Sequence, residues 1–175
     1  MTARQEFITL QSYNGFELRE YLPCVLAEVN VSAQFSEASS AAFGRLFKYI
    51  SKGNKNSEKI AMTAPVIAAQ KTDKGHSHEW FVSFVMPSGS ALSQMPNPND
   101  PQVRLREVGS EKCVALSFRG RTDEALSDMR VHELRQLAAN ENIALSDEVR
   151  ICRFDPPFKP GFMHYNEIVT PLLDK

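Results

Sequence analysis

Residues 105–116 read LREVGSEKCVAL, and half a chain earlier residues 18–27 read LREYLPCVLA. Each stretch holds two short runs of strand-forming residues on either side of a turn, so each predicts two consecutive strands. A segment with helical spacing of apolar residues follows both pairs, and two more strand-like runs follow each helix. The sequence therefore predicts two pseudo-symmetric ββαββ repeats, at about residues 5–87 and 103–172, joined by a Pro-rich connector at 88–102.

The first repeat begins with a predicted hairpin at Asn14-Gly15, the dipeptide that most favours a tight two-residue turn. Its helix is predicted to stop at Gly53, and its apolar residues at i, i+3, i+4 and i+7 are Phe43, Leu46, Phe47 and Ile50. Residues 59–68, KIAMTAPVIA, are predicted to form a single buried strand after this helix.

These elements predict one α+β domain over residues 1–175. The two repeats are expected to join their sheets into a distorted antiparallel β-barrel flanked by two helices. A composition of 42% hydrophobic residues with 11 Phe is enough for a large core without metal or disulfide support. A cleft between pseudo-equivalent halves is also a common place for a small-molecule site.

Charge and cysteine content exclude several classes of partner. The 20 Lys and Arg nearly balance the 21 Asp and Glu, so no charge excess favours nucleic acid or anionic lipid. No apolar run approaches the ~20 residues of a membrane span, and a cytoplasmic protein is expected. Cys24, Cys113 and Cys152 are predicted to be buried free thiols in a reducing compartment. The oligomeric state is open, with a monomer slightly favoured.

The histidines offer few metal sites. His76 and His78 could share a metal ion, but they lie in a polar loop without an obvious third ligand, and a solvated loop is the simpler interpretation. His132 is expected on the surface of the second helix. His164 follows the rigid aromatic and basic segment PPFKPGFM, and it could be a metal ligand, a propionate partner or the first residue of a strand.

Catalysis has little support in the motifs. No G-x-S-x-G elbow, phosphate-binding Gly-rich loop or Cys with an evident His partner is present. Glu20, Glu107 and Glu167 lie on predicted strands, where a carboxyl group facing a cavity could become a general acid or base. The alternative is that they face solvent or pair with neighbouring arginines.

The apolar and basic residues suggest a site for a planar ligand. Flat or polarisable side chains that pack well on a large ring are Phe43, Phe47, Met62, Phe158, Phe162 and Met163. Arg45, Lys48 and Lys159 could meet carboxylates at its rim. Periodicity alone assigns the helix aromatics to the core. Loops are normally polar, so the apolar residues Phe158, Phe162 and Met163 of the Pro-rich loop late in the chain indicate a lid or a site wall.

Five segments together carry a resemblance to a known family: AFGRLFKYISKGNKNSEKIAMTAPVI, VMPSG, PNPNDPQVRLRE, RFDPPFKPGF and NEIVTP. In this order and over residues 13–171, the chain resembles the SOUL family of haem-binding proteins. The resemblance implies a distorted antiparallel barrel with two helices, built from a duplicated unit and similar to bacterial effector-binding domains. It also implies reversible, non-catalytic binding of haem b or free porphyrin in an apolar cleft between the first helix and the late Pro-rich loop.

The same resemblance implies the residues of that cleft: Phe43, Leu46, Phe47, Met62, Phe158, Lys159, Phe162, Met163 and His164. His164 is the one suggested nitrogen ligand for iron. The position of an axial histidine proposed for one branch of the family is Glu20 here, which rules out histidine ligation at that place. Whether Met62 faces the cleft or the core stays open.

Haem transport, buffering or signalling are the roles that the resemblance implies. Three other functions remain as alternatives. The chain could bind another amphipathic small molecule, or it could be a small hydrolase that uses Glu20 or Glu167. It could also dock a protein partner through Phe158 and Phe162 of the late loop.

Overall fold

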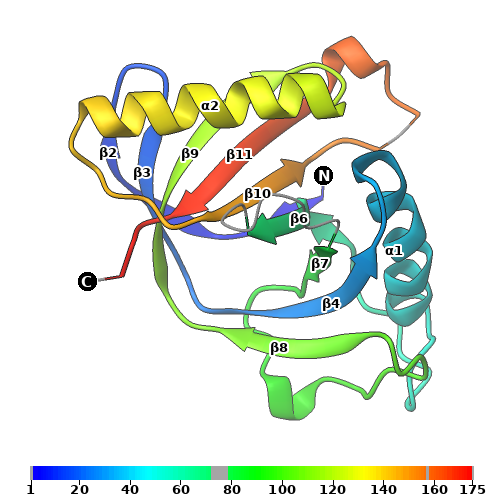
Figure 1. Cartoon of the computed structure of the whole chain (residues 1–175). Coiled ribbons are helices and arrows are strands. Elements are labelled where there is room, and N and C mark those ends of the chain that lie inside the picture. Colours follow the sequence, from blue (N-terminus) through cyan, green and yellow to red (C-terminus); the bar gives the residue numbers. More distant parts are fainter. Residues whose placement is uncertain (1, 72–78, 157, 175) are drawn as a thin grey trace.

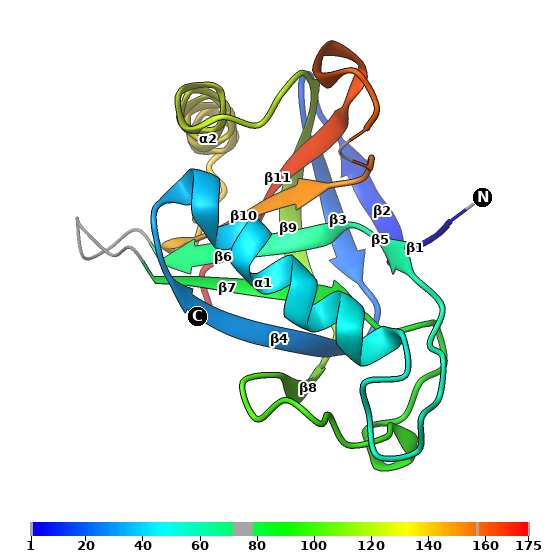
Figure 2. The ribbon, with the colours of Figure 1, turned by 90° about the vertical axis from the view of Figure 1, so that its right-hand side faces the viewer.

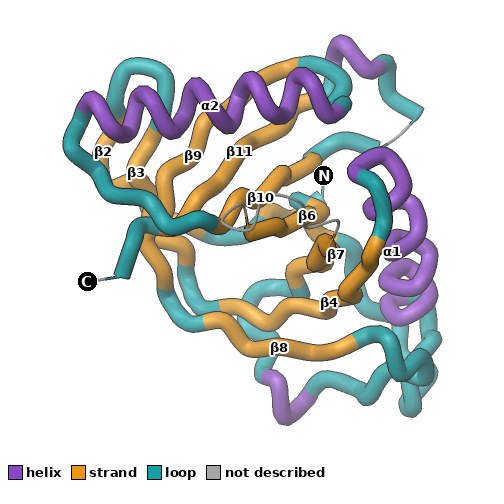
Figure 3. Tube along the Cα trace, viewed as in Figure 1, coloured by secondary structure: helices purple, strands orange, loops and turns teal. Residues whose placement is uncertain are grey.

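The computed structural model describes residues 2–71, 79–156 and 158–174. One antiparallel sheet of nine strands curls into a half-barrel, and two helices lie on its outer, convex side (Figures 1 and 3). The strand order is β2-β3-β9-β11-β10-β6-β7-β4-β8, so the sheet is open between β2 and β8. The α+β class, the antiparallel sheet and the two flanking helices are confirmed, whereas the expected barrel is half-closed.

The nine strands of the sheet are β2 (Phe7–Ser12), β3 (Glu17–Tyr21), β4 (Cys24–Ser32), β6 (Val66–Lys71), β7 (Glu79–Val85), β8 (Arg104–Val108), β9 (Glu111–Arg119), β10 (Glu148–Arg153) and β11 (Tyr165–Pro171). The helices are α1 (Phe35–Ile50) and α2 (Glu124–Asn140), with short 3-10 turns η1 (Leu92–Gln94) and η2 (Gly161–Met163). A separate two-stranded sheet pairs β1 (Ala3–Arg4) in parallel with β5 (Thr63–Ala64).

Each half of the chain has the expected order of elements, β3-β4-α1-β6-β7 and then β8-β9-α2-β10-β11. Apart from β2, which has no counterpart, the strand order of the sheet also reads the same from either edge when the two halves are exchanged, with β10 beside β6 at its centre. This arrangement is compatible with duplicated units. The duplication itself stays a prediction.

Two side-chain faces follow from the period-two alternation of the strands. On β4, Val25, Ala27 and Val29 are buried in the main core, which the two helices cover. Leu26 points to the opposite, concave face and belongs to a second, smaller apolar cluster with Ile67. α1 contacts β4 and β7, and α2 contacts β9 and β11, so the helices cover separate halves of the convex face (Figure 2).

The buried stripe of α1 differs from the predicted one. Its small residues Ala38 and Ala42 share the core side with Leu46 and Tyr49, at the spacing of one helix face. Phe43 and Phe47 are 37% and 49% exposed, so their assignment to the core by periodicity is wrong. The bulky rings therefore lie beside the sheet, not beneath the helix.

Local interactions explain where α1 ends and where α2 begins. The backbone N–H of Gly53 donates to the Lys48 carbonyl at 2.8 Å, and a Cβ at Gly53 would lie 2.4 Å from that oxygen, so glycine suits this stop. Asp123 caps α2 by accepting a hydrogen bond from the Leu126 N–H at 2.8 Å. On α2, Leu134 and Ala138 are buried.

The predicted strand at residues 59–68 is only partly correct. The structure has two strands there, β5 and β6, with Pro65 between them, and β6 continues to Lys71. Proline has no N–H for a ladder, which explains the break. The hairpin at Asn14-Gly15 is confirmed by the antiparallel pairing of β2 with β3, and Gly15 has a positive φ of 95°.

The three cysteines are free thiols, with Cys113 and Cys152 buried and Cys24 half-buried. Burial raises the pKa of Cys113 to about 12, so this thiol stays protonated. None of the described helices combines the length and the apolar character that crossing a bilayer requires.

Candidate functional site

A cleft of about 620 Å³ opens between the first half of α1 and the late loop, residues 154–164. Ser39, Ser40 and Phe43 of α1 line one side, and Val66 at the start of β6 lines the floor. The opposite side carries Arg121, Thr122, Arg153, Asp155, Lys159 and His164. One wall is therefore partly apolar and the other is polar and charged, which suits an amphipathic ligand.

Phe43 supplies an anchored aromatic surface. Its ring packs edge-on against the buried ring of Phe84, with centroids 5.4 Å apart. It also stacks with Phe47, at 5.8 Å between centroids and 14° between planes. Offset stacks of this kind are favourable arrangements of aromatic quadrupoles. The two rings form a flat apolar surface on the exposed side of α1, and Phe43 is the one that lines the cleft.

The charged wall is net positive. Arg121, Arg153 and Lys159 face a single carboxylate, Asp155. Lys159 Nζ lies 2.9 Å from Asp155 Oδ1, and Arg153 donates to the Thr122 carbonyl at 3.4 Å. Arg121 is exposed and forms no ion pair with any described residue. The cleft lining thus holds three cationic side chains and one carboxylate, and the charge of Arg121 has no ion-pair partner among the described residues, which favours an anionic ligand.

Asp155 orders the late loop at its base. One carboxylate oxygen accepts the Tyr165 backbone N–H at 2.6 Å, and the other pairs with Lys159. The hydrogen bond from Tyr165, reinforced by Lys159, lowers the pKa of Asp155 below its ordinary value. The carboxylate therefore ties the start of the loop to its middle, at Lys159, and to Tyr165, the residue that follows it.

His164 joins the cleft through the same loop. Its Nε2 lies 2.7 Å from the Lys159 carbonyl oxygen. A carbonyl can only accept, so Nε2 carries the proton, and in a neutral ring Nδ1 keeps the lone pair. The ring is therefore held in one orientation with a basic nitrogen left for a ligand.

Of the nine residues predicted for the site, the structure brings three together around the cleft: Phe43, Lys159 and His164. Phe47 lies beside them through its stack with Phe43. Phe158, Phe162 and Met163 are 88%, 78% and 44% exposed on the loop and do not line the cleft as it stands.

The two remaining residues of the nine pack inward. Leu46 is completely buried in the main core. Met62 is half-buried against that core, and it does not line the cleft, which answers the question of its orientation. Among the other candidates, Arg45 pairs with Asp100 of the connector at 2.7 Å. His132 is exposed on α2, as expected, and His76 and His78 lie outside the described residues.

Several cleft residues were not predicted: Ser39, Ser40, Val66, Arg121, Arg153 and Asp155. Arg121 precedes α2, far in the chain from the late loop, so only the fold brings them together. Asp155 lies within the segment RFDPPFKPGF, which the sequence already singles out, so of these residues it was the easiest to predict. An acidic residue beside two prolines is a common way to fix a loop.

The glutamates proposed as acid–base groups are engaged elsewhere. Glu167 is buried, and its carboxylate accepts hydrogen bonds from both Nη atoms of Arg19, at 3.0 and 2.7 Å. Burial alone would lower the pKa of Arg19, but the bonds and charge of Glu167 and Tyr21 hold that pKa above its ordinary value. Glu20 accepts from Ser110 at 3.2 Å and Glu107 is exposed.

Comparison with known proteins shows which solved structures share this fold. In fold, the C-terminal domain of EcmrR is similar with a TM-score of 0.67 and 14% identity, over 91% of this chain and 98% of that domain. A hydrolase from Listeria innocua is similar with a TM-score of 0.64 and 12% identity, over 94% of both chains. At these identities the likeness is one of fold alone. The molecule therefore shares the curled-sheet fold of these two proteins.

The sequence comparisons identify the family. The model of the SOUL heme-binding protein family matches residues 2–171, and the chain belongs to this family. "Heme-binding protein 1" of Xenopus laevis is 29% identical over 148 residues, 83% of this chain and 78% of that protein. Its Xenopus tropicalis counterpart is 27% identical over the same shares. The family and these relatives are named for binding and not for catalysis, so the hydrolase alternative has no support.

Proposed function

We propose that this protein binds haem or free porphyrin reversibly in the cleft between α1 and the late loop, for haem transport, buffering or signalling. The observation that carries the proposal is the composition of the cleft, which joins the ring of Phe43 to an excess of cationic side chains. A porphyrin has the matching chemistry, because a flat apolar macrocycle carries two propionates on one edge.

The residues fit such a ligand in size and in charge. A cleft of about 620 Å³ is within the range of about 300–1,000 Å³ of small-molecule sites. Phe43 and Val66 would contact the macrocycle, and Arg121 and Lys159 would pair with its propionates. Phe158, Phe162 and Met163 are exposed apolar residues of the neighbouring loop, and we propose that they cover the ligand.

Iron, when bound, would offer a coordination position for a nitrogen ligand. His164 is the residue that could provide it, since its Nε2 proton is held by the Lys159 carbonyl and Nδ1 keeps a lone pair. The apolar and cationic contacts do not depend on iron. We therefore propose that free porphyrin binds as well, with His164 adding affinity for the iron-containing form.

Titration with ferric haem and with iron-free protoporphyrin, followed by the Soret band, tests the proposal. Phe43→Asp places a carboxylate against the macrocycle and should weaken both ligands at least about tenfold, which is ~1.4 kcal/mol. The matched control is Met129→Asp, which adds the same charge at an apolar residue, 57% exposed, of the other helix. Wild-type affinities in a folded Phe43→Asp protein would refute the site.

A further inference from the structure

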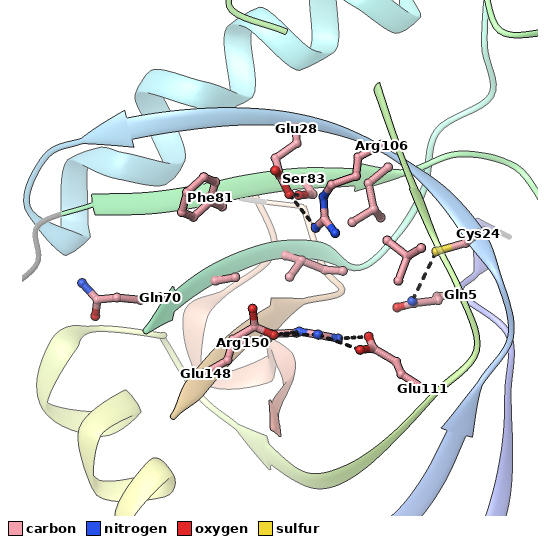
Figure 4. Close-up of a pocket in the computed structure, with 14 residues that line it drawn as sticks. Gln5, Cys24, Glu28, Gln70, Phe81, Ser83, Arg106, Glu111, Glu148 and Arg150 are labelled. Atoms are coloured by element: carbon pink, nitrogen blue, oxygen red, sulfur yellow. Dashed lines mark hydrogen bonds and ion pairs between the residues drawn. The ribbon is translucent and has the colours of Figure 1, made fainter. Parts of the chain in front are cut away.

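The concave face of the half-barrel has a cavity of its own, of about 310 Å³ (Figure 4). Strands β4, β6, β7, β8, β9 and β10 contribute its walls, and none of its described lining residues also lines the α1 cleft. We call this cavity the trough. Its floor is apolar, with Leu26, Ile67 and the 37% exposed ring of Phe81.

One end of the trough holds a charge cluster centred on Arg150. Arg150 bonds to Glu148 through Nε and to Glu111 through Nη1 and Nη2, and Nη2 is also 2.6 Å from Glu148. All three guanidinium nitrogens are therefore engaged. This cluster ties β10 to β9.

The other end is chemically open. Glu28 has a side chain only 15% exposed, and its Oε2 accepts from Ser83 Oγ at 3.1 Å and from Arg106 Nη2 at 2.9 Å. Its Oε1 has no hydrogen-bond partner among the described residues. Arg106 is 54% exposed and holds Glu28 with a single nitrogen. A single hydrogen bond from an exposed arginine is readily exchanged for a bidentate partner.

The charge of the trough also favours a cation. Its lining carries three carboxylates, Glu28, Glu111 and Glu148, against two guanidiniums, Arg106 and Arg150. Glu111 and Glu148 share Arg150, so the excess negative charge lies at their end, and at the other end only the exposed Arg106 balances Glu28. The Phe81 ring beside it can add a cation–π contact.

We propose that the trough is a second ligand site, which binds a small guanidinium or amidinium on a flat apolar body with its charge on Glu28. The guanidinium of Arg106 already donates a hydrogen bond to the Glu28 carboxylate, so this carboxylate can bind a planar cation of that type. A ligand with two parallel N–H donors would use both carboxylate oxygens, where Arg106 uses one. Its apolar body would cover Leu26, Ile67 and Phe81.

The probe for this site is 4-aminobenzamidine, an aryl amidine whose fluorescence rises when water leaves its surroundings. Saturable binding is expected in the wild type, and Glu28→Gln should weaken it at least about tenfold. Glu107→Gln removes the same charge from an exposed position of β8 and should leave the affinity unchanged. A Glu28→Gln protein that melts like wild type and binds equally well would overturn the proposal.

Arg106→Ala makes the prediction sharper, since it removes the competitor for Glu28 and should tighten binding of the probe. Arg104→Ala deletes the same charge two residues away on β8 and tests for a general electrostatic effect. Equal gains in both variants would count against a specific exchange at Glu28. Saturating protoporphyrin should not displace the probe, and displacement would place the probe in the α1 cleft and refute a separate trough site.

Discussion

The imidazole of His164 is fixed by a backbone oxygen five residues earlier, with 2.7 Å between its Nε2 and the carbonyl oxygen of Lys159. The carbonyl determines which nitrogen carries the proton, so Nδ1 is the nitrogen that can bind iron. His164→Ala should therefore weaken ferric haem at least about tenfold, or ~1.4 kcal/mol, and shift its Soret band. Iron-free protoporphyrin should bind that variant as it binds wild type, and parallel losses for both ligands would contradict ligation by His164.

Acid should loosen the late loop through Asp155. Its pKa is lower in the folded protein because of the Tyr165 N–H and Lys159, so its contribution to stability is present above the unfolded value, about 3.9, and is lost as pH falls through the folded pKa. Asp155→Asn should be less stable than wild type at pH 7, and the gap should shrink below about pH 4. Urea unfolding from pH 7 to pH 3 measures the gap.

The control for Asp155 is Asp128→Asn on the exposed side of α2, which also removes one carboxylate. A gap between Asp155→Asn and wild type that stays constant over the whole pH range would show that the charge is not the source of the stability. Protoporphyrin affinity measured on the same series reports whether the loop and the cleft loosen together.

The buried ion pair of Arg19 and Glu167 should behave as one unit. Both side chains are 5% exposed, so Arg19→Met leaves a buried carboxylate without its partner and should cost about 3–5 kcal/mol in the free energy of unfolding. The double variant Arg19→Met with Glu167→Met should recover most of that loss. Urea unfolding of the four proteins gives the coupling energy, and losses that simply add would contradict a coupled pair.

Two glycines at α1 should respond to alanine with opposite signs. Gly44 has open space at its Cβ position within the helix, so Gly44→Ala should stabilise the protein by about 0.5–1 kcal/mol. At Gly53 the new Cβ would lie 2.4 Å from the Lys48 carbonyl, so Gly53→Ala should destabilise it. Thermal melts compare the pair, and a stabilising Gly53→Ala would disprove the close approach.

Much of the fold could be predicted from local signals. The repeated strands, the Asn14-Gly15 turn and the Gly53 stop each depend on neighbouring residues, and the structure has elements at all three places. The two strands of each repeated stretch do not pair with each other, since β3 pairs with β9 and β4 with β8. Both helices follow for the same reason. The closure of the sheet could not be predicted, because the pairing of β10 with β6 joins strands about half a chain apart. The half-barrel is set by such distant pairings.

The site was harder to predict than the fold. α1 has two apolar stripes, and the sequence does not tell which one faces the sheet; the alanines Ala38 and Ala42 are buried and the larger Phe43 is not. Small side chains allow a helix to approach a sheet closely, and that advantage appears only in three dimensions. Arg121 reaches the cleft by the same kind of tertiary placement, although nothing near it in the sequence indicates a ligand.

Val66 and Ile67 are consecutive residues of β6, and they line different cavities, Val66 the α1 cleft and Ile67 the trough. The strand β6 therefore separates the α1 cleft from the trough, and the two are the chambers on either side of this partition. Because side chains alternate along a strand, a one-residue insertion in β6 would turn each lining toward the wrong chamber and spoil both at once. The ladders to β7 and β10 hold that partition in register from both sides. Length changes in β6 should thus be far less acceptable over evolution than changes in the loops around it.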